Sequence, residues 1–398
     1  MVRPSLEVAD ILRDHGLAWR QANRGHISIG QLKVMSAIER CRTAALGGHV
    51  TRCESCEHTE IAYNSCRNRH CPKCQGAVAK QWLAQREAEL LPVSYFHVVF
   101  TVPTQIGNIA YQNKAVVYNL LFKAAAETLL TIGADPKHLG ARLGLIGVLH
   151  TWGSAMTHHP HLHFIVPGGG LSLDGNAWVA SRDNFLVHVK VLSARFKRLF
   201  LDKLLALYAE QRLEFFAKLE PLAQPRTFKR LIARLRRRKW YVDARPPFAG
   251  PKAVLAYLSR YTHRVAIANS RLIDFNEHHV TFTWKVYRAK QHNRYKTMTL
   301  DTPEFIRRFL IHIVPHGFHR IRHYGLFANA QRKHNLDKAR QLLGVITPQD
   351  RNDSEAAPEP ATPDWLLCPT CGTTMRIVDV FDSSHVPPPP PHRGGDPP

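Results

Sequence analysis

The stretch His161-Leu162-His163 offers two imidazoles at a spacing suited to holding one metal ion. It lies in the apolar segment HLHFIV, whose β-branched and aromatic residues predict a strand. Because side chains alternate along a strand, both imidazoles face one side while Leu162 faces the other. Imidazoles about 7 Å apart on a strand can share one ion. Such a pair can also be purely structural, so the motif needs support from the rest of the chain.

A second pair of reactive side chains lies in the sequence YLSRY, where Tyr257 and Tyr261 are four residues apart. Pro251 suits the first position of a helix because its missing N–H has no partner there. On that helix the two tyrosines share one face. An aromatic stripe of this kind often faces a core. The neighbouring cations Arg260 and Arg264 instead favour a helix that lies beside a nucleic acid.

Six of the eight cysteines fall between Cys41 and Cys74, which in a reducing compartment indicates metal binding more often than disulfides. Two CxxC turns separated by fourteen residues can complete a tetrahedral zinc site, and so apolar-poor a segment needs one to fold. The late CxxC at Cys368 and Cys371 has no obvious partner. The predicted zinc ligands are Cys53, Cys56, Cys71 and Cys74; a possible second zinc would use Cys41, His49, Cys66 and His70.

The formal charge of +23 predicts a polyanionic partner, with nucleic acid favoured over an anionic membrane. No apolar run approaches the ~18 residues of a membrane helix. The N-terminus lacks the pattern of a signal peptide, so we expect a cytoplasmic protein. These features exclude a secreted protein, a membrane protein and an enzyme of acidic small metabolites. From Pro348 onward the chain has 12 of its 26 prolines and an excess of acidic residues, which predicts a mostly disordered tail.

The segment from Arg226 to Lys239 carries eight cations in fourteen residues and is followed by Trp240 and Tyr241. A charge run is usually a solvated face, but the adjoining aromatics favour a phosphate track with base-stacking platforms. The stretch 307–322, with Phe309, His319 and Tyr324, has a similar character. The predicted DNA contacts are Arg234, Arg236, Arg237, Arg238, Lys239, Arg260 and Arg264.

The elements that must position these motifs are mixed helices and strands, which predicts an α+β fold. Helices are expected within residues 1–40, 110–133, 190–240 and 303–342, strands at 94–103, 143–152 and 161–166, and a hairpin at 278–300. Four domains are predicted: a helical lead and zinc-binding module (1–90), a sheet domain (91–275) with a basic helical insertion at about 185–245, a basic DNA-binding region (276–345) and the tail (346–398).

Four motifs occur in the order SCRNRHCPKC, YFHVVFTVP, HPHLHFIVPGGG and YLSRY. Together they closely resemble the rolling-circle insertion-sequence transposases with a HUH fold and paired tyrosines, the IS-ninety-one family. The resemblance covers roughly residues 10–345. It implies a zinc-ribbon-like module followed by a ferredoxin-like antiparallel sheet, and an endonuclease and strand transferase that acts on single-stranded DNA in the bacterial cytoplasm or nucleoid.

The resemblance also assigns roles. His161 and His163 would hold Mg²⁺ or Mn²⁺, and Tyr257 and Tyr261 would be the nucleophiles that form a 5′-phosphotyrosine. Zn²⁺ would be structural, and the partner would be the single-stranded ends of the element itself, with no membrane and no small-molecule substrate. A third ligand of the catalytic ion is expected but not assigned. Its candidates are His97, His158, His159 and His263.

Three alternatives compete with this interpretation. A plasmid replication initiator or a relaxase would share the HUH site. A non-catalytic zinc-containing DNA-binding protein would bind DNA without forming a covalent adduct. A transposase that uses three carboxylates would leave HLH and YLSRY unexplained, and no acidic trio stands out in the sequence.

Overall fold

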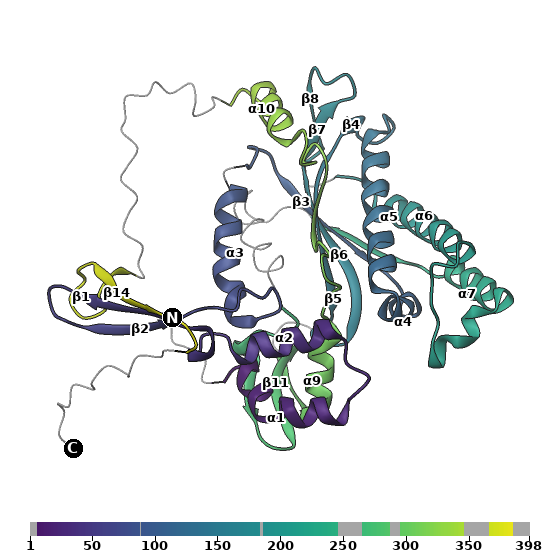
Figure 1. Cartoon of the computed structure of the whole chain (residues 1–398). Coiled ribbons are helices and arrows are strands. Elements are labelled where there is room, and N and C mark those ends of the chain that lie inside the picture. Colours follow the sequence, from purple (N-terminus) through teal and green to yellow (C-terminus); the bar gives the residue numbers. More distant parts are fainter. Residues whose placement is uncertain are drawn as a thin grey trace.

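A computed structural model describes residues 6–87, 89–183, 186–245, 265–286, 295–345 and 366–384 of the 398-residue chain. Helices and strands are mixed and the sheets are antiparallel, so the predicted α+β class is confirmed (Figure 1). Three short 3₁₀ helices lie among the described elements: η1 (Ala44–Leu46), η2 (Ala217–Ala223) and η3 (Asn269–Arg271).

The centre of the molecule is a five-stranded antiparallel sheet in the order β13-β5-β6-β3-β9. Its central strands are long and apolar on both faces, since layers of helices and loops cover the sheet on both sides. The strands are β3 (Tyr95–Thr101), β5 (Gly144–Trp152), β6 (His158–Pro167), β9 (Tyr241–Arg245) and β13 (Ile321–Gly325).

Four helices cover one face of this sheet, on the right in Figure 1. Phe100 and Phe164 from the strands pack there against Phe196 and Trp240 in the largest hydrophobic core. One of these helices is long and apolar enough to cross a membrane, but most of that stretch is buried in the core, as expected for a core helix. The helices are α4 (Thr104–Gln112), α5 (Lys114–Ala134), α6 (Val189–Ala209) and α7 (Pro225–Arg237); α5 is the apolar one.

The opposite face of the sheet carries a smaller apolar cluster near one end. Tyr95, Ile146 and Ile165 from the strands pack there with Phe327 and Leu336. The surrounding elements are α3 (Pro72–Glu87), α10 (Arg332–Leu342) and a small antiparallel sheet of β4 (Ala141–Arg142), β7 (Gly169–Ser172) and β8 (Trp178–Ala180).

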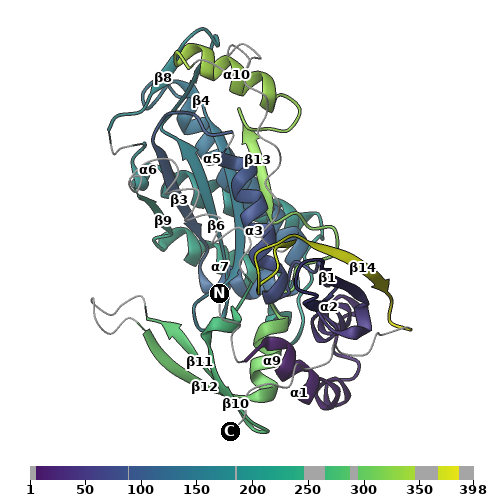
Figure 2. The ribbon, with the colours of Figure 1, turned by 90° about the vertical axis from the view of Figure 1, so that its left-hand side faces the viewer.

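The first two helices pack with elements from far along the chain. The apolar face of α1 begins at Val8 and Ile11, and these residues share a core with Phe282, Phe305 and Ile306. With Met156 and Ile267 also in it, this core spans three of the predicted domains. Figure 2 shows α1 beside α9, next to a three-stranded antiparallel sheet. The elements are α1 (Val8–Ala22), α2 (Ile29–Glu39), α9 (Thr302–Leu310), β10 (Leu272–Phe275), β11 (His279–Lys285) and β12 (Tyr295–Asp301).

A fourth described sheet joins a segment near the start of the chain to one near its end. Its order is β14-β1-β2, with strands β1 (Gly48–Cys53), β2 (Thr59–Tyr63) and β14 (Met375–Phe381). Both neighbours run antiparallel to β1, and the sheet stands apart from the main sheet in Figure 1.

Most of the predicted elements are confirmed, including the strands at 94–103, 143–152 and 161–166 and the hairpin formed by β11 and β12. Two expectations are corrected. Residues 321–325, predicted as helical, form β13, and residues 241–245, placed in the helical insertion, form β9; both complete the main sheet. Within the tail, predicted as mostly disordered, the structure describes residues 366–384, which contribute β14. The helix predicted at 251–261 lies outside the described residues.

Candidate metal and nucleic-acid site

Three histidines from two neighbouring strands gather on the face of the main sheet opposite the four helices. His150 on β5 and His161 and His163 on β6 place a ring nitrogen each within 4.8 Å of one another. Their ring centroids lie 4.5 Å (His150 to His163), 4.8 Å (His161 to His163) and 5.4 Å (His150 to His161) apart. The register explains the cluster, because His150 is directly opposite His161. The two predicted ligands are thus joined by a third histidine.

Hydrogen bonds orient two of the three rings. His163 Nδ1 lies 2.7 Å from His97 Nε2, and the two ring planes agree within 1°. His161 Nδ1 donates to the carbonyl oxygen of His159 at 2.7 Å. Because Nδ1 is used in both cases, Nε2 is the nitrogen through which His161 and His163 can bind a metal ion. A second group that fixes the ring and tautomer of a ligand is typical of histidine metal sites.

Burial favours the neutral form of His161 in the cluster and of His97 beside it. It lowers the pKa of His161 to about 4, and it also lowers the pKa of His97 to about 4, with a smaller contribution from Arg245. Neutral imidazoles keep a lone pair for a metal ion. The donor set of three nitrogens fits a divalent transition ion such as Mn²⁺ better than Mg²⁺, which prefers oxygen ligands.

None of the described histidines considered for the third ligand belongs to the trio, although the His159 ring centroid lies 5.4 Å from that of His161. His158 Nε2 is 2.8 Å from the Tyr118 hydroxyl, and His159 is exposed. His97 is close, but it contacts His163 rather than completing the trio. His263 lies outside the described residues. The sequence analysis did not identify His150. It lies near the end of an apolar strand, and the alternation of side chains along that strand turns it to the face that carries His161.

Four other predicted residues, Tyr257, Tyr261, Arg260 and Arg264, also lie outside the described residues. Their roles stay predictions from the sequence.

The eight cysteines form two groups that differ from the predicted ones. Within each group the four sulfur atoms lie within 4.8 Å of one another. The predicted site of Cys53, Cys56, Cys71 and Cys74 is corrected, because its two CxxC turns belong to different groups. The groups are Cys41, Cys66, Cys71 and Cys74, and Cys53, Cys56, Cys368 and Cys371.

The first group fits one tetrahedral zinc ion. The sulfur of Cys74 lies 3.6 Å from those of Cys41 and Cys66, close to the separation of about 3.8 Å that Zn–S bonds of about 2.3 Å give in a tetrahedron. The histidines predicted to join Cys41 and Cys66 are not in this group. His49 lies on β1 opposite Ala62, and His70 is buried, with a pKa well below its usual value because of that burial.

The basic helix α7 leads through Arg238 and Lys239 to β9, the edge strand of the main sheet. Its apolar residues are buried and its cations are exposed, one of them, Arg236, in an ion pair with Asp202 at 2.9 Å. Trp240, expected to stack on bases, is buried in the core and donates to the Leu235 carbonyl. Tyr241 is 60% exposed, as a stacking residue must be.

The register extends the histidine cluster into a row across four strands. His150, His161, Thr101 and Tyr241 lie opposite one another in turn, so their side chains share one face. With strands about 4.8 Å apart, Tyr241 lies about 10 Å from His161. The cations Arg238 and Lys239 immediately precede this row in the chain.

The second basic stretch is engaged within the protein. Arg307 and Arg308 form ion pairs with Glu304 at 2.6 and 2.7 Å. Arg320 is buried, and the Arg322 guanidinium lies 4.3 Å from the Phe122 ring centre. Phe309, expected near DNA, is buried as well. These residues therefore support the fold, and the case for DNA contact rests on α7.

Two protein families match the chain, one described as "Putative transposase" over residues 144–335 and one as "Transposase zinc-binding domain" over residues 11–102. A relative from Sinorhizobium fredii, "Putative transposase y4qJ", is 51% identical over 395 residues, 98% of each chain. The chain belongs to the IS91 family of transposases. The transposase for insertion sequence element IS801 of Pseudomonas savastanoi pv. phaseolicola is 28% identical over 354 residues, 87% of this chain and 82% of that relative. No solved structure matches the chain.

The two family matches cover different candidate metal sites of this transposase. The transposase match contains the three histidines of the cluster and both predicted tyrosines. The zinc-binding match contains the first cysteine group together with Cys53 and Cys56, which supports structural zinc in this part of the chain. Cys368 and Cys371 lie beyond both matches.

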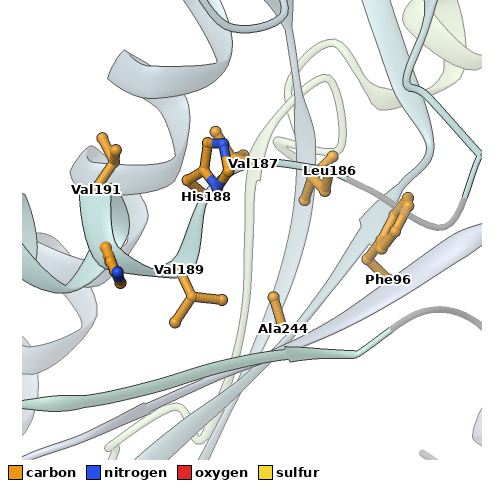
Figure 3. Close-up of a pocket in the computed structure, with 8 residues that line it drawn as sticks. Phe96, Leu186, Val187, His188, Val189, Val191 and Ala244 are labelled. Atoms are coloured by element: carbon orange, nitrogen blue, oxygen red, sulfur yellow. The ribbon is translucent and has the colours of Figure 1, made fainter.

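A separate pocket of about 540 Å³ lies between the start of α6 and the edge of the main sheet (Figure 3). Its lining is mostly apolar, with Leu186 and Val189 facing Phe96 and Ala244. The two sheet residues belong to the face that packs on the helices, opposite the histidine cluster. The transposase therefore keeps this pocket apart from the candidate metal site.

Proposed function

We propose that this transposase cleaves and joins the single-stranded DNA ends of its own element through a covalent tyrosine intermediate at the histidine cluster. The observation that carries the proposal is the convergence of His150, His161 and His163, which supports the assignment of HLH to a HUH nuclease site. Their ring nitrogens on one sheet face make a site for a divalent ion that can touch a DNA phosphate.

The tyrosines supply the nucleophile. The hydroxyl oxygen of Tyr257 or Tyr261 loses its proton and bonds to the scissile phosphorus, the bond from phosphorus to the 3′-oxygen breaks, and that oxygen takes up a proton. The product is a 5′-phosphotyrosine and a 3′-hydroxyl. One phosphodiester replaces another, so the second tyrosine or a 3′-hydroxyl can reverse the step on another strand. A divalent ion at the cluster would polarise the phosphate as a Lewis acid.

The DNA strand is proposed to follow the row that leads to the cluster. The exposed cations at the end of α7 would neutralise its phosphates, and Tyr241 would stack on a base about 10 Å from His161. Thr101 lies between His161 and Tyr241 in the row, and its small side chain would leave room for the DNA strand on this face of the sheet. Lys197 supports the path by donating to the carbonyl oxygens of Arg236 and Arg238.

In functional terms, residues 1–90 would form the zinc-binding module and 91–275 the catalytic domain, with the basic insertion at about 185–245 guiding DNA. The region 276–345 would act mainly as support, because Arg307, Arg308 and Arg322 in its described part are engaged within the protein. Both relatives are named as transposases, which favours this role over a plasmid initiator or a relaxase.

A covalent-adduct assay tests the proposal. The protein is incubated with labelled single-stranded oligonucleotides from the ends of its element and Mn²⁺, and a denaturant-resistant protein–DNA band is measured. We expect the band with the wild type and with either Tyr257→Phe or Tyr261→Phe, and we expect it to be lost in the double variant. His150→Ala and His161→Ala should reduce it at least tenfold.

The exposed loop residue His138 gives a matched control, since His138→Gln removes a histidine that does not belong to the cluster and should keep the band. If DNA binding persists but no strand yields an adduct, the protein is a binding module and the catalytic proposal is wrong. If His150→Ala keeps full activity while His161→Ala loses it, His150 is not a ligand.

A further inference from the structure

We propose that Cys53, Cys56, Cys368 and Cys371 bind a second zinc ion, in a zinc ribbon whose two halves come from opposite ends of the chain. The site is separate from the first cysteine group, and half of it lies beyond the region that matches the zinc-binding family. It would tie the C-terminal segment to the N-terminal module.

The two CxxC turns have the same backbone architecture. In the first turn, Cys53 N–H donates to the His58 carbonyl and Glu57 N–H donates to the Cys53 carbonyl. In the second turn, Cys368 N–H donates to Thr373 and Gly372 N–H donates to Cys368. The donors and acceptors occupy matching positions in both turns.

The residue after each CxxC completes the match. Glu57 and Gly372 both adopt positive φ, of 59° and 75°. Positive φ is costly for a residue such as glutamate, so an identical turn at Glu57 indicates a constraint beyond local preference. Paired turns of this form are how a zinc ribbon presents two thiolates from each half.

The sulfur positions fit one tetrahedral ion. Cys53 Sγ is 3.5 Å from Cys371 Sγ, and Cys56 Sγ is 3.5 Å from Cys368 Sγ. These separations are close to the ~3.8 Å expected for four Zn–S bonds and far above the ~2.0 Å of a disulfide. Four cysteine sulfurs select zinc among the common divalent ions, and their thiols release protons as they bind it.

The strands carry the connection further. After the second turn the chain continues into β14, which pairs with β1 from Gly48↔Phe381 to Cys53↔Met375. Thus β1 is the central strand, held on one side by its own hairpin partner and on the other by a segment more than 300 residues away. Arg376 adds an ion pair with Glu54 at 2.8 Å inside the first turn.

Zinc stoichiometry tests the proposal without any DNA. Native mass spectrometry of the full chain should find one zinc ion fewer in Cys368→Ser/Cys371→Ser than in the wild type. Thr370→Ala, an exposed change inside the same turn, should keep the wild-type count. The same zinc count in the wild type and the double variant would overturn the proposal. Because the count needs no catalysis, it stands or falls independently of the proposed nuclease activity.

A cut-chain experiment covers the case in which the serine variant folds poorly. A recognition site for a specific protease is inserted into the full chain between residues 346 and 365, and the purified protein is cut. We expect the C-terminal fragment to co-elute with the body on size exclusion in the presence of Zn²⁺ and to separate after chelation. A fragment that leaves while zinc is present, or stays equally well after chelation, refutes the zinc connection.

Discussion

Replacing His97 by phenylalanine is expected to lower the affinity of the histidine cluster for a divalent ion and to leave DNA binding unchanged. His97 does not join the trio, but its Nε2 lies 2.7 Å from His163 Nδ1. Both rings are only 7% exposed, so water cannot easily replace the lost hydrogen bond. Phenylalanine keeps the ring volume and removes the partner, which isolates the positioning role of His97.

The lost hydrogen bond sets the size of the expected loss in metal affinity. Leaving a buried polar group without its partner costs about 1–3 kcal/mol, which corresponds to a loss of about 5- to 150-fold in an equilibrium constant. Groups that orient histidine ligands show the same range, about 10- to 100-fold in metal affinity or activity. His97→Gln retains an amide that can hydrogen-bond and should recover part of the loss.

The assay is the rate of oligonucleotide cleavage as a function of Mn²⁺ concentration. We expect His97→Phe to raise the half-saturating Mn²⁺ concentration by about 10- to 100-fold and to approach the wild-type rate when Mn²⁺ is saturating. His138→Gln should leave the curve unchanged. A lower rate at every Mn²⁺ concentration, with the half-saturating value unmoved, would refute the positioning role.

Three further predictions concern DNA, charge and packing. Tyr241→Ala should weaken single-strand binding by about 1–3 kcal/mol, measured by fluorescence anisotropy, with no loss of thermal stability because the ring is 60% exposed. Hydrogen bonds from Arg307, partly opposed by burial, lower the pKa of Glu304 to about 2. Its contribution, discounted to about 1 kcal/mol for partial exposure, is therefore present above the unfolded pKa of about 4.3 and is lost as the pH falls toward 2. Glu304→Gln should accordingly lower stability in urea at pH 7 and make no difference near pH 2. Gly147→Ala would place a Cβ 2.7 Å from the Phe164 ring in the core and should cost about 1–3 kcal/mol in the same unfolding experiment.

Local alternation was enough to predict that two of the three clustered histidines share a face. The motif HLH places His161 and His163 on one face of a strand wherever that strand lies, because the period of two is a property of the strand itself. His150 could not be assigned in this way. It reaches His161 only through the pairing of β5 with β6, and register between strands is set by the whole sheet.

The cysteines show where spacing misleads. Bringing together two CxxC turns that are fourteen residues apart costs less chain entropy than joining turns from distant parts of the chain. The sequence therefore favours a site within residues 53–74. The fold instead places Cys53 with Cys371, 318 residues away, because β14 pairs with β1. The available signal was the similarity of the late CxxC turn to the early one.

Trp240 shows the same limit for the basic segment. Next to a run of cations it resembles a stacking platform, yet it lies between the end of α7 and the start of β9, where its indole is buried and donates to the Leu235 carbonyl. The alternation of side chains along extended backbone decides which aromatic enters the core. Tyr241, one residue later on the alternating strand β9, is turned to the opposite face and stays exposed.

The split ribbon has a consequence for the order of events during synthesis. Cys56 and Cys368 are 312 residues apart, so at about 5–20 residues per second the first CxxC turn waits roughly 16 to 60 s for the second. Throughout that interval the thiols of Cys71 and Cys74 are already made, and the pairing that spacing favours is the one within reach. Zinc must therefore bind Cys71 and Cys74 together with Cys41 and Cys66 early in synthesis. Cys53 and Cys56 are then still without a metal ion when Cys368 and Cys371 are made.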